Sequence, residues 1–302
     1  ITKGRQGQTI AEMGELAEAG VMGFSDDGSP VMSSLVMRQA MEYSRNFGLP
    51  IIEHCEDIDL SKNGQMNEGI IAARLGLAGI PAAAEESMIA RNIALAELTG
   101  AHLHATHVST AGSVDLIRRA KDKGINITAD VTPHHLTLTE DILMEYDTDA
   151  KVNPPLRTQK DIEALIEGLK DNTIDVIATD HAPHTLVDKQ CEFDLASFGI
   201  SIFETAFGML MKLVHDDKIS LQMLLEKLTS APAAILNDRF GKFGTLETGT
   251  SADMVIIDPA LEWTVDPQKF KSKGKNTPLA GKTLRGKVTA TIYQGRQVYI
   301  YQ

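Results

Sequence analysis

The sequence predicts an α/β fold of parallel βα units, followed by a small β-rich region. Short apolar runs alternate with segments whose apolar residues recur at helical spacing, which is typical of parallel βαβ units. No glycine-rich phosphate loop of the dinucleotide or Walker type follows an apolar run. These observations leave a (β/α)₈ barrel and a doubly wound sheet open. Helical spacing stops near residue 246, so we assign residues 1–245 to the βα region and 246–302 to the β-rich region.

The first half of the chain alternates helix and strand. Ile10, Met13, Leu16 and Ala17 lie at helical spacing, and Gly20 follows as a stop signal. The same criteria then predict, in order, a strand over 21–24, a helix over 32–41, a strand over 49–52, a helix over 87–99, a strand over 101–108, a helix over 113–123 and a strand over 125–131.

The second half begins in the same way and then changes character. Thr158 and Asp161 resemble a capping box, and Ile162, Leu165 and Leu169 form the apolar stripe of the helix that follows. We then predict a strand over 174–179, helices over 201–215 and 220–236, and β-strands over 252–258, 288–293 and 297–301.

Composition excludes several classes of protein. Lys and Arg number 29 against 41 Asp and Glu, and this net charge of −12 argues against a nucleic-acid partner. No run approaches about 18 apolar residues, so we expect no membrane span. Two cysteines, Cys55 and Cys191, form no disulfide framework and favour a cytoplasmic location. The chain begins at Ile1 with neither an initiator Met nor a signal-peptide pattern, so we expect a piece of a longer protein.

Metal-competent side chains follow the predicted strands. Any one of them has an ordinary explanation, because a single His at a strand end is often structural and an Asp-Asp-Gly sequence is a common turn. We expect His102 and His104, which alternate along a strand, to be structural. In a barrel, however, all strand ends converge on one face, and His nitrogen with Asp oxygen suits a divalent metal such as Zn²⁺. The residues concerned are Asp26-Asp27, His54, His107, His134-His135 and Asp180-His181.

Six segments carry a more specific pattern. They are Phe24-Ser25-Asp26-Asp27-Gly28, Glu53-His54-Cys55-Glu56-Asp57, Thr106-His107-Val108-Ser109-Thr110, Val131-Thr132-Pro133-His134-His135-Leu136, Lys151-Val152-Asn153-Pro154-Pro155-Leu156-Arg157 and Ala178-Thr179-Asp180-His181-Ala182-Pro183-His184. In this order they resemble the class I dihydroorotases, which are cyclic amidohydrolases of pyrimidine biosynthesis. The segment 249–258 resembles the stretch by which amidohydrolases re-enter a β-sandwich.

The resemblance implies a fold and an activity. The fold is an amidohydrolase-type (β/α)₈ barrel, of which about five strands lie in this chain, with a small β-sandwich domain. The activity is the reversible, metal-dependent hydrolysis of the cyclic amide of dihydroorotate to N-carbamoyl-L-aspartate on the route to UMP. The cofactor is Zn²⁺, one or two ions per active site.

The resemblance also implies residue roles. His54 and His107 are metal ligands, and Asp180 is both a ligand and the general acid/base. Asp27 is a bridging carboxylate in place of the carboxylated lysine of many relatives. Since hydantoinases and allantoinases usually carry Lys there, the acid favours a dihydroorotase.

Substrate contacts follow from the same match. Asn153, His184, Phe198 and Gly199 correspond to positions that hold the substrate. Residues 184–198 correspond to a mobile loop near it.

One part of the family pattern is absent from this chain. No His-x-His-x-Arg motif, which supplies two ligands and the Arg for the substrate carboxylate, occurs in it; His102-Leu103-His104 is followed by Ala105-Thr106. The resemblance implies that about 120 residues of the family pattern are missing on the N-terminal side, as a separate or cleaved piece, and the five βα units found here agree because a barrel needs eight. A homodimer and an aspartate transcarbamoylase partner are further expectations. The alternatives are a non-catalytic subunit that scaffolds aspartate transcarbamoylase, and a hydantoinase or allantoinase.

Overall fold

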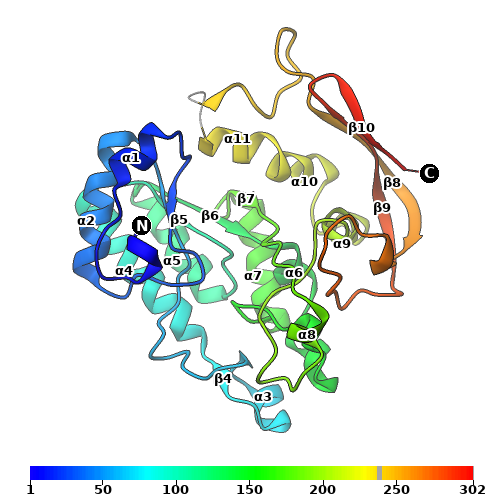
Figure 1. Ribbon diagram of the computed structural model, residues 1–302, viewed down its shortest axis with the longest axis horizontal. Coiled ribbons are helices and arrows are strands. Elements are labelled where there is room, and N and C mark those ends of the chain that lie inside the picture. Colours follow the sequence, from blue (N-terminus) through cyan, green and yellow to red (C-terminus); the bar gives the residue numbers. More distant parts are fainter. Residues whose placement is uncertain (237–239, 302) are drawn as a thin grey trace. The chain divides into compact units, whose positions relative to one another are not determined.

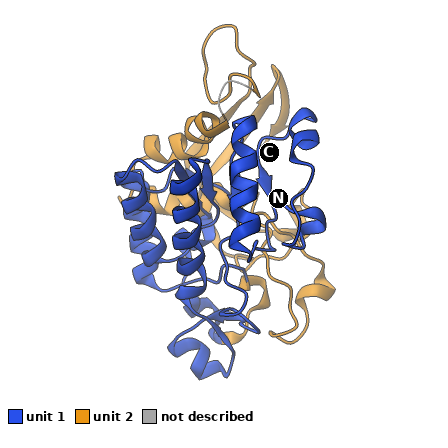
Figure 2. Cartoon of the chain, turned by 90° about the vertical axis from the view of Figure 1, so that its left-hand side faces the viewer, with its two compact units in different colours: residues 1–144, 152–178 blue, residues 145–151, 179–302 orange. Residues whose placement is uncertain are grey.

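The chain forms two compact units in the computed structural model, which describes residues 1–236 and 240–301. The first unit comprises Ile1–Met144 and Val152–Ala178, and the second comprises Glu145–Lys151 and Thr179–Gln302 (Figure 2). The boundary predicted at residue 246 lies inside the second unit. The assignment of residues 1–245 and 246–302 to two domains therefore stays a prediction.

A five-stranded parallel sheet forms the centre of the first unit. Short strands suffice because their side chains are almost completely buried: Ile51, Leu103 and Ala129 have no exposed surface. All five strands predicted for this region have a counterpart, although each is shorter than its apolar run and β1 shares only Phe24 with the predicted strand 21–24. The strands are β1 (Phe24–Ser25), β2 (Ile51–Glu53), β5 (Leu103–Ala105), β6 (Ile127–Val131) and β7 (Val176–Ile177), in the order β1-β2-β5-β6-β7.

Four helices of this unit pack side by side, α2 on α4, α4 on α5 and α5 on α7 (Figure 1). Ser33 and Thr110 cap α2 and α5 through their hydroxyl groups, and the main-chain N–H and hydroxyl of Thr158 donate to Asp161 at the start of α7. The helices of the unit are α1 (Met13–Glu18), α2 (Ser34–Ser44), α3 (Ile70–Leu75), α4 (Ala82–Thr99), α5 (Ala111–Asp122), α6 (Pro133–Thr137) and α7 (Gln159–Lys170).

Some elements of the first unit differ from the prediction. Helix α4 begins at Ala82, five residues before the predicted start, because Pro81 in extended conformation precedes an Ala-rich first turn. The strands β3 (Met66–Asn67) and β4 (Gly79–Ile80), with α3 between them, carry no periodic signal and were not expected. Short 3₁₀ turns cover Lys3–Arg5, Arg45–Phe47 and Glu140–Glu145.

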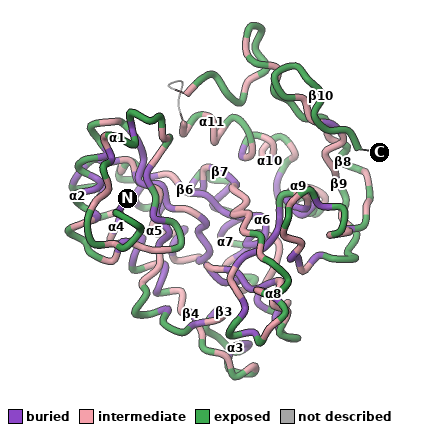
Figure 3. The backbone as a smooth tube through the Cα atoms, in the orientation of Figure 1, coloured by how far each residue is buried: buried purple, intermediate pink, exposed green. Residues whose placement is uncertain are grey.

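The second unit combines helices with an antiparallel sheet of three strands, β10-β9-β8. The helix predicted over 220–236 is broken at Thr229, whose φ of −132° and ψ of −80° are not helical, and the helix predicted from 201 begins at Ala206. The strands are more exposed than those of the first unit (Figure 3). The elements are α8 (Leu186–Lys189), α9 (Ala206–His215), α10 (Leu221–Leu228), α11 (Ser230–Leu236), β8 (Met254–Thr264), β9 (Thr283–Tyr293), β10 (Arg296–Ile300) and 3₁₀ turns at Thr148–Ala150 and Pro267–Lys269.

Candidate metal centre and substrate loop

Three metal-competent side chains of the first unit follow the carboxyl ends of adjacent parallel strands. Asp27 comes two residues after β1, His54 directly after β2, and His107 two residues after β5. Because neighbouring parallel strands end at the same edge of a sheet, these residues meet although they lie far apart in sequence.

The three side chains bring their ligand atoms together. The Nδ1 of His54 lies 2.9 Å from the Nε2 of His107, and the Oδ1 of Asp27 lies 3.3 Å from His107 Nε2 and 3.6 Å from His54 Nδ1. Both histidines are buried, whereas the carboxylate of Asp27 is about half exposed. The group is therefore anchored in the protein and open on one side.

This donor set fits a divalent cation. Two imidazole nitrogens that face each other require a proton or a cation between them, and a carboxylate oxygen completes the set. Ligand atoms around a tetrahedral Zn²⁺ with bonds of about 2.0–2.1 Å are separated by about 3.3 Å, close to the spacing found here. The residues can thus hold a metal ion through two nitrogens and one oxygen.

Electrostatics keep the acidic ligand ionised. The hydrogen bond from His107 lowers the pKa of Asp27 to about 2, and this effect outweighs the partial burial, which raises the pKa. An ionised carboxylate is the form that binds a cation.

A second carboxylate, which the sequence pattern did not single out, orients His54. The Oε2 of Glu56 lies 2.8 Å from the Nε2 of His54 and accepts a 2.9 Å hydrogen bond from the Nδ2 of Asn153. Burial raises the pKa of Glu56, but the hydrogen bond from His54 and further polar contacts outweigh it and bring the pKa to about 2. Since ionised Glu56 can only accept, His54 carries its proton on Nε2 and directs the lone pair of Nδ1 toward Asp27 and His107.

A third carboxylate, Asp130 of β6, fixes the backbone at His107. Its Oδ1 accepts the main-chain N–H of His107 at 2.8 Å, and its Oδ2 accepts from His104 Nε2 at 2.9 Å and from the Thr106 hydroxyl at 2.8 Å. These bonds hold His107 in a left-handed conformation with φ of 40°, which few non-glycine residues adopt. An Asp inside the apolar strand 127–131 is the sequence signal that could have identified it.

The remaining histidines of the first unit lie outside this group. His102 and His104 both contact the hydroxyl of Thr128 at 2.8 Å, as expected for structural residues. His135 in α6 lies 2.9 Å from the carbonyl of Pro154, and burial lowers its pKa to about 4. His134 is fully buried, and neither ring nitrogen finds a hydrogen-bond partner among the described residues.

Asp180, the fourth predicted ligand, belongs to the second unit. The backbone of Asp180 has a left-handed φ of 46°. The side chain of its neighbour His181 fixes this segment through hydrogen bonds. The Nδ1 of His181 accepts the main-chain N–H groups of Ile202 at 3.0 Å and Phe203 at 3.2 Å, and its Nε2 lies 3.2 Å from the hydroxyl of Ser272. Burial lowers the pKa of His181, which is consistent with a neutral ring that accepts on Nδ1.

The predicted substrate residues of the second unit are linked by hydrogen bonds, directly or through Asn276. The Nε2 of His184 donates to the carbonyl of Phe198 at 2.8 Å. The buried side chain of Asn276 accepts the N–H of His184 at 2.8 Å and donates to the carbonyl of Gly199 at 3.0 Å. Both ends of the segment 184–199 thus meet at Asn276, a residue that no sequence pattern marked.

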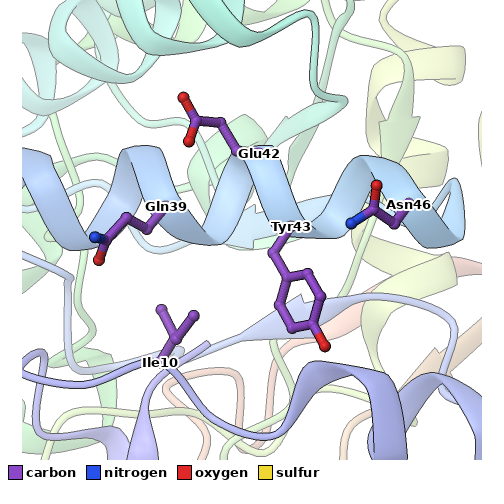
Figure 4. A pocket seen from close by; sticks show the side chains of 5 residues that line it. All are labelled: Ile10, Gln39, Glu42, Tyr43 and Asn46. Carbon is purple, nitrogen blue, oxygen red and sulfur yellow. The ribbon is translucent and has the colours of Figure 1, made fainter.

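A surface hollow lies beside α2 (Figure 4). It has a volume of about 430 Å³, and none of the metal-competent residues lines it. It is lined by Ile10, Gln39, Glu42, Tyr43 and Asn46. Within residues 1–236 and 240–301, no helix has the length and apolar character needed to span a bilayer.

Comparison with known proteins connects this geometry to curated relatives. Residues 4–298 match the Amidohydrolase family. The chain is 54% identical to a dihydroorotase of Caldanaerobacter subterraneus subsp. tengcongensis and 53% identical to a dihydroorotase of Thermoanaerobacter sp., over 99% of this chain and 69% of each relative.

Solved structures agree on the fold. An L-hydantoinase (dihydropyrimidinase) from Arthrobacter aurescens superposes with a TM-score of 0.84 and 25% identity over 96% of this chain and 68% of that one. A dihydropyrimidinase from Brevibacillus agri superposes with a TM-score of 0.82 and 22% identity over 94% of this chain and 65% of that one. The parallel sheet is thus part of a (β/α)₈ barrel, and the chain spans about two thirds of the length of these relatives. The chain belongs to the amidohydrolase family and, within it, to the dihydroorotases, which are hydrolases that act on cyclic amides.

Proposed function

We propose that this chain provides the metal-binding and proton-transfer groups for the reversible conversion of dihydroorotate to N-carbamoyl-L-aspartate in pyrimidine biosynthesis. Asp27, His54 and His107 would bind zinc, and Asp180 would complete the ligand set. The single observation that carries the proposal is the convergence of one carboxylate oxygen and two imidazole nitrogens in a chain 54% identical to a dihydroorotase.

The residues divide the chemistry between them. A bound divalent metal supplies a Lewis acid for the ring carbonyl and lowers the pKa of water toward about 7. Asp180 accepts the proton of the attacking water and delivers it to the departing ring nitrogen, so that one carboxylate acts first as base and then as acid. In the direction of synthesis, Asp180 takes the proton from the nitrogen that closes the ring and delivers it to the departing water.

Substrate binding is assigned to amide and main-chain groups. Asn153, which Glu56 orients through the 2.9 Å hydrogen bond, offers an amide to the ring. His184, Phe198 and Gly199 offer imidazole and main-chain groups from the second unit. A His-x-His-x-Arg segment outside this chain would provide two further ligands and the cation for the substrate carboxylate.

The test uses the full-length protein that contains this chain. We expect bound zinc by elemental analysis and hydrolysis of dihydroorotate, both lost in His54→Ala and retained in His215→Gln, a histidine of α9 outside the group. A metal-free protein without turnover would indicate a non-catalytic subunit, and turnover of hydantoins or allantoin alone would indicate another cyclic amidohydrolase. Either result would contradict the proposal.

A further inference from the structure

The loop 184–199 carries predicted substrate groups but contains little regular structure. Its only helix is α8, which has four residues. The carbonyl groups of such a loop need donors from elsewhere, because buried carbonyls without partners are costly. Three of them receive side-chain donors from two lysines, namely those of Phe193, Asp194 and Ser197.

Those lysines are buried, which is rare for an ammonium group. Lys151 is 1% exposed and Lys189 is 2% exposed. The Nζ of Lys151 donates to the carbonyls of Phe193 at 2.7 Å and Asp194 at 3.3 Å, and the Nζ of Lys189 donates to the carbonyls of Ser197 at 2.7 Å and Lys151 at 3.3 Å. A methionine would fill the same space but would offer no N–H donor.

The two lysines also reach the residues predicted to contact substrate. The Nζ of Lys151 lies 4.5 Å from the centre of the Phe198 ring, and the carbonyl of Lys151 accepts the N–H of Gly199 at 2.9 Å. Gly199 has a φ of +141°, and a Cβ there would lie 2.6 Å from the carbonyl oxygen of Ala182. The turn at Phe198 and Gly199 is thus held by its contacts with Lys151, and the carbonyl of Ala182 lies so close that a side chain at Gly199 would not fit.

We propose that Lys151 and Lys189 are positioning residues that hold the loop 184–199 in the conformation that presents Phe198 and Gly199 to the substrate. The inference deepens the proposed function and depends on it for the identity of the ligand. Burial lowers the pKa of each lysine to about 8, so these two groups carry a desolvation cost. Retaining them at that cost is consistent with a need for their N–H donors.

The first experiment uses wild-type, full-length protein and therefore does not depend on the folding of a variant. An amine-reactive reagent modifies lysines, and peptide mass spectrometry follows each site. Lys151 and Lys189 should react only when the loop opens, so N-carbamoyl-L-aspartate should slow their modification about fivefold or more. Lys227 of α10, also buried and in the same unit, should react at an unchanged rate.

The second experiment compares Lys151→Met and Lys189→Met with the matched control Lys227→Met. We expect each loop variant to raise KM about tenfold with kcat within about threefold and zinc content unchanged, because the loop positions substrate and does not hold the metal. Faster hydrogen exchange should be confined to the loop. Unchanged KM together with ligand-independent labelling of both lysines would overturn the inference. Absence of turnover and zinc in the wild type would instead refute the proposed function. The hydrogen-exchange measurement would then still report whether the lysines hold the loop.

Discussion

The two units stabilise their functional segments with charges of opposite sign that are buried or, for Glu56, mostly buried. In the first unit, Asp130 and Glu56 accept N–H groups and thereby orient His107 and His54 at the ends of short strands. In the second unit, Lys151 and Lys189 donate N–H groups to the carbonyls of a loop. The difference follows from what each segment lacks. The histidines need acceptors, which fix the tautomer of His54 and the backbone of His107, whereas an irregular loop needs donors for its main-chain carbonyls.

Mutations in the two units should therefore have different effects. Changes around the strand ends should reduce metal affinity first, and changes around the loop should reduce substrate affinity first. Measurements of zinc content and of KM on the same variants would show whether the two functions separate in this way.

The largest effect is expected for His107→Ala. The variant removes a ligand nitrogen that no neighbouring side chain can replace, so we expect loss of bound zinc and a decrease in turnover of at least ~10³-fold. Elemental analysis and a dihydroorotate assay on full-length protein measure both quantities. Bound zinc with near-normal turnover would show that His107 is not a ligand.

A smaller effect is expected for Asp130→Ala, which leaves His107 in place but removes its main-chain support. We expect metal affinity to decrease about 10–100-fold, measured by titration of metal-free protein with Co²⁺. The control Asp175→Asn changes another carboxylate beside the same sheet, which accepts the N–H of Ala129 at 2.8 Å, and should leave the affinity unchanged. Equal losses in both variants would indicate a general loss of sheet stability.

The sequence predicted the metal-competent residues better than the residues that hold them in place. His54, His107 and the pair Asp26-Asp27 could be singled out because parallel strands end at one edge of a sheet, whereas the choice of Asp27 over Asp26 came only from the resemblance to the dihydroorotases. Glu56 was missed because its role depends on which ring nitrogen of His54 it faces, and no spacing rule encodes a tautomer. Asp130 was missed although an acid inside an apolar strand is a signal, because its role depends on a main-chain contact with His107. Lys151 and Lys189 were missed because a charged residue in a polar segment indicates a surface position.

The secondary structure was also predicted only in part. The strands with apolar runs and the longer helices were located correctly, although their bounds were not: β8 extends to Thr264 and β9 begins at Thr283, beyond the predicted strands 252–258 and 288–293. The two-residue strands β3 and β4 were not predicted, because hydrophobic periodicity requires a longer segment. The break at Thr229 was also missed, although Pro232 signals it: a proline inside a helix has no N–H to donate and its ring clashes with the carbonyl four residues before it, here that of Leu228.

A moderate effect is expected for Gly199→Ala in the substrate loop. A side chain at φ of +141° is strained, and its Cβ would approach the Ala182 carbonyl oxygen to 2.6 Å, so we expect a loss of about 1–3 kcal/mol in stability and a higher KM. Thermal unfolding and steady-state kinetics measure these effects. The matched control Gly249→Ala also has a positive φ, of +97°, but no atom lies within 4 Å of the point that its Cβ would occupy, so it should change stability without changing KM.

The smallest effect is a pH dependence of the loop lysines. Burial lowers the pKa of Lys189 from 10.5 to about 8, against the attraction of Asp149 and Asp147 and with a further contribution from Lys151. A base with a lower pKa in the folded state binds fewer protons there, so its contribution to the free energy of unfolding rises as pH increases from about 8 to 10.5. The neutral amine keeps two N–H donors without the desolvation cost of the ammonium group. We therefore expect the Tm difference between wild type and Lys189→Met to widen from pH 7 to pH 9.5, while the difference for Lys212→Met, an exposed lysine of α9, stays constant. A difference that narrows at high pH would show that the positive charge itself stabilises the loop.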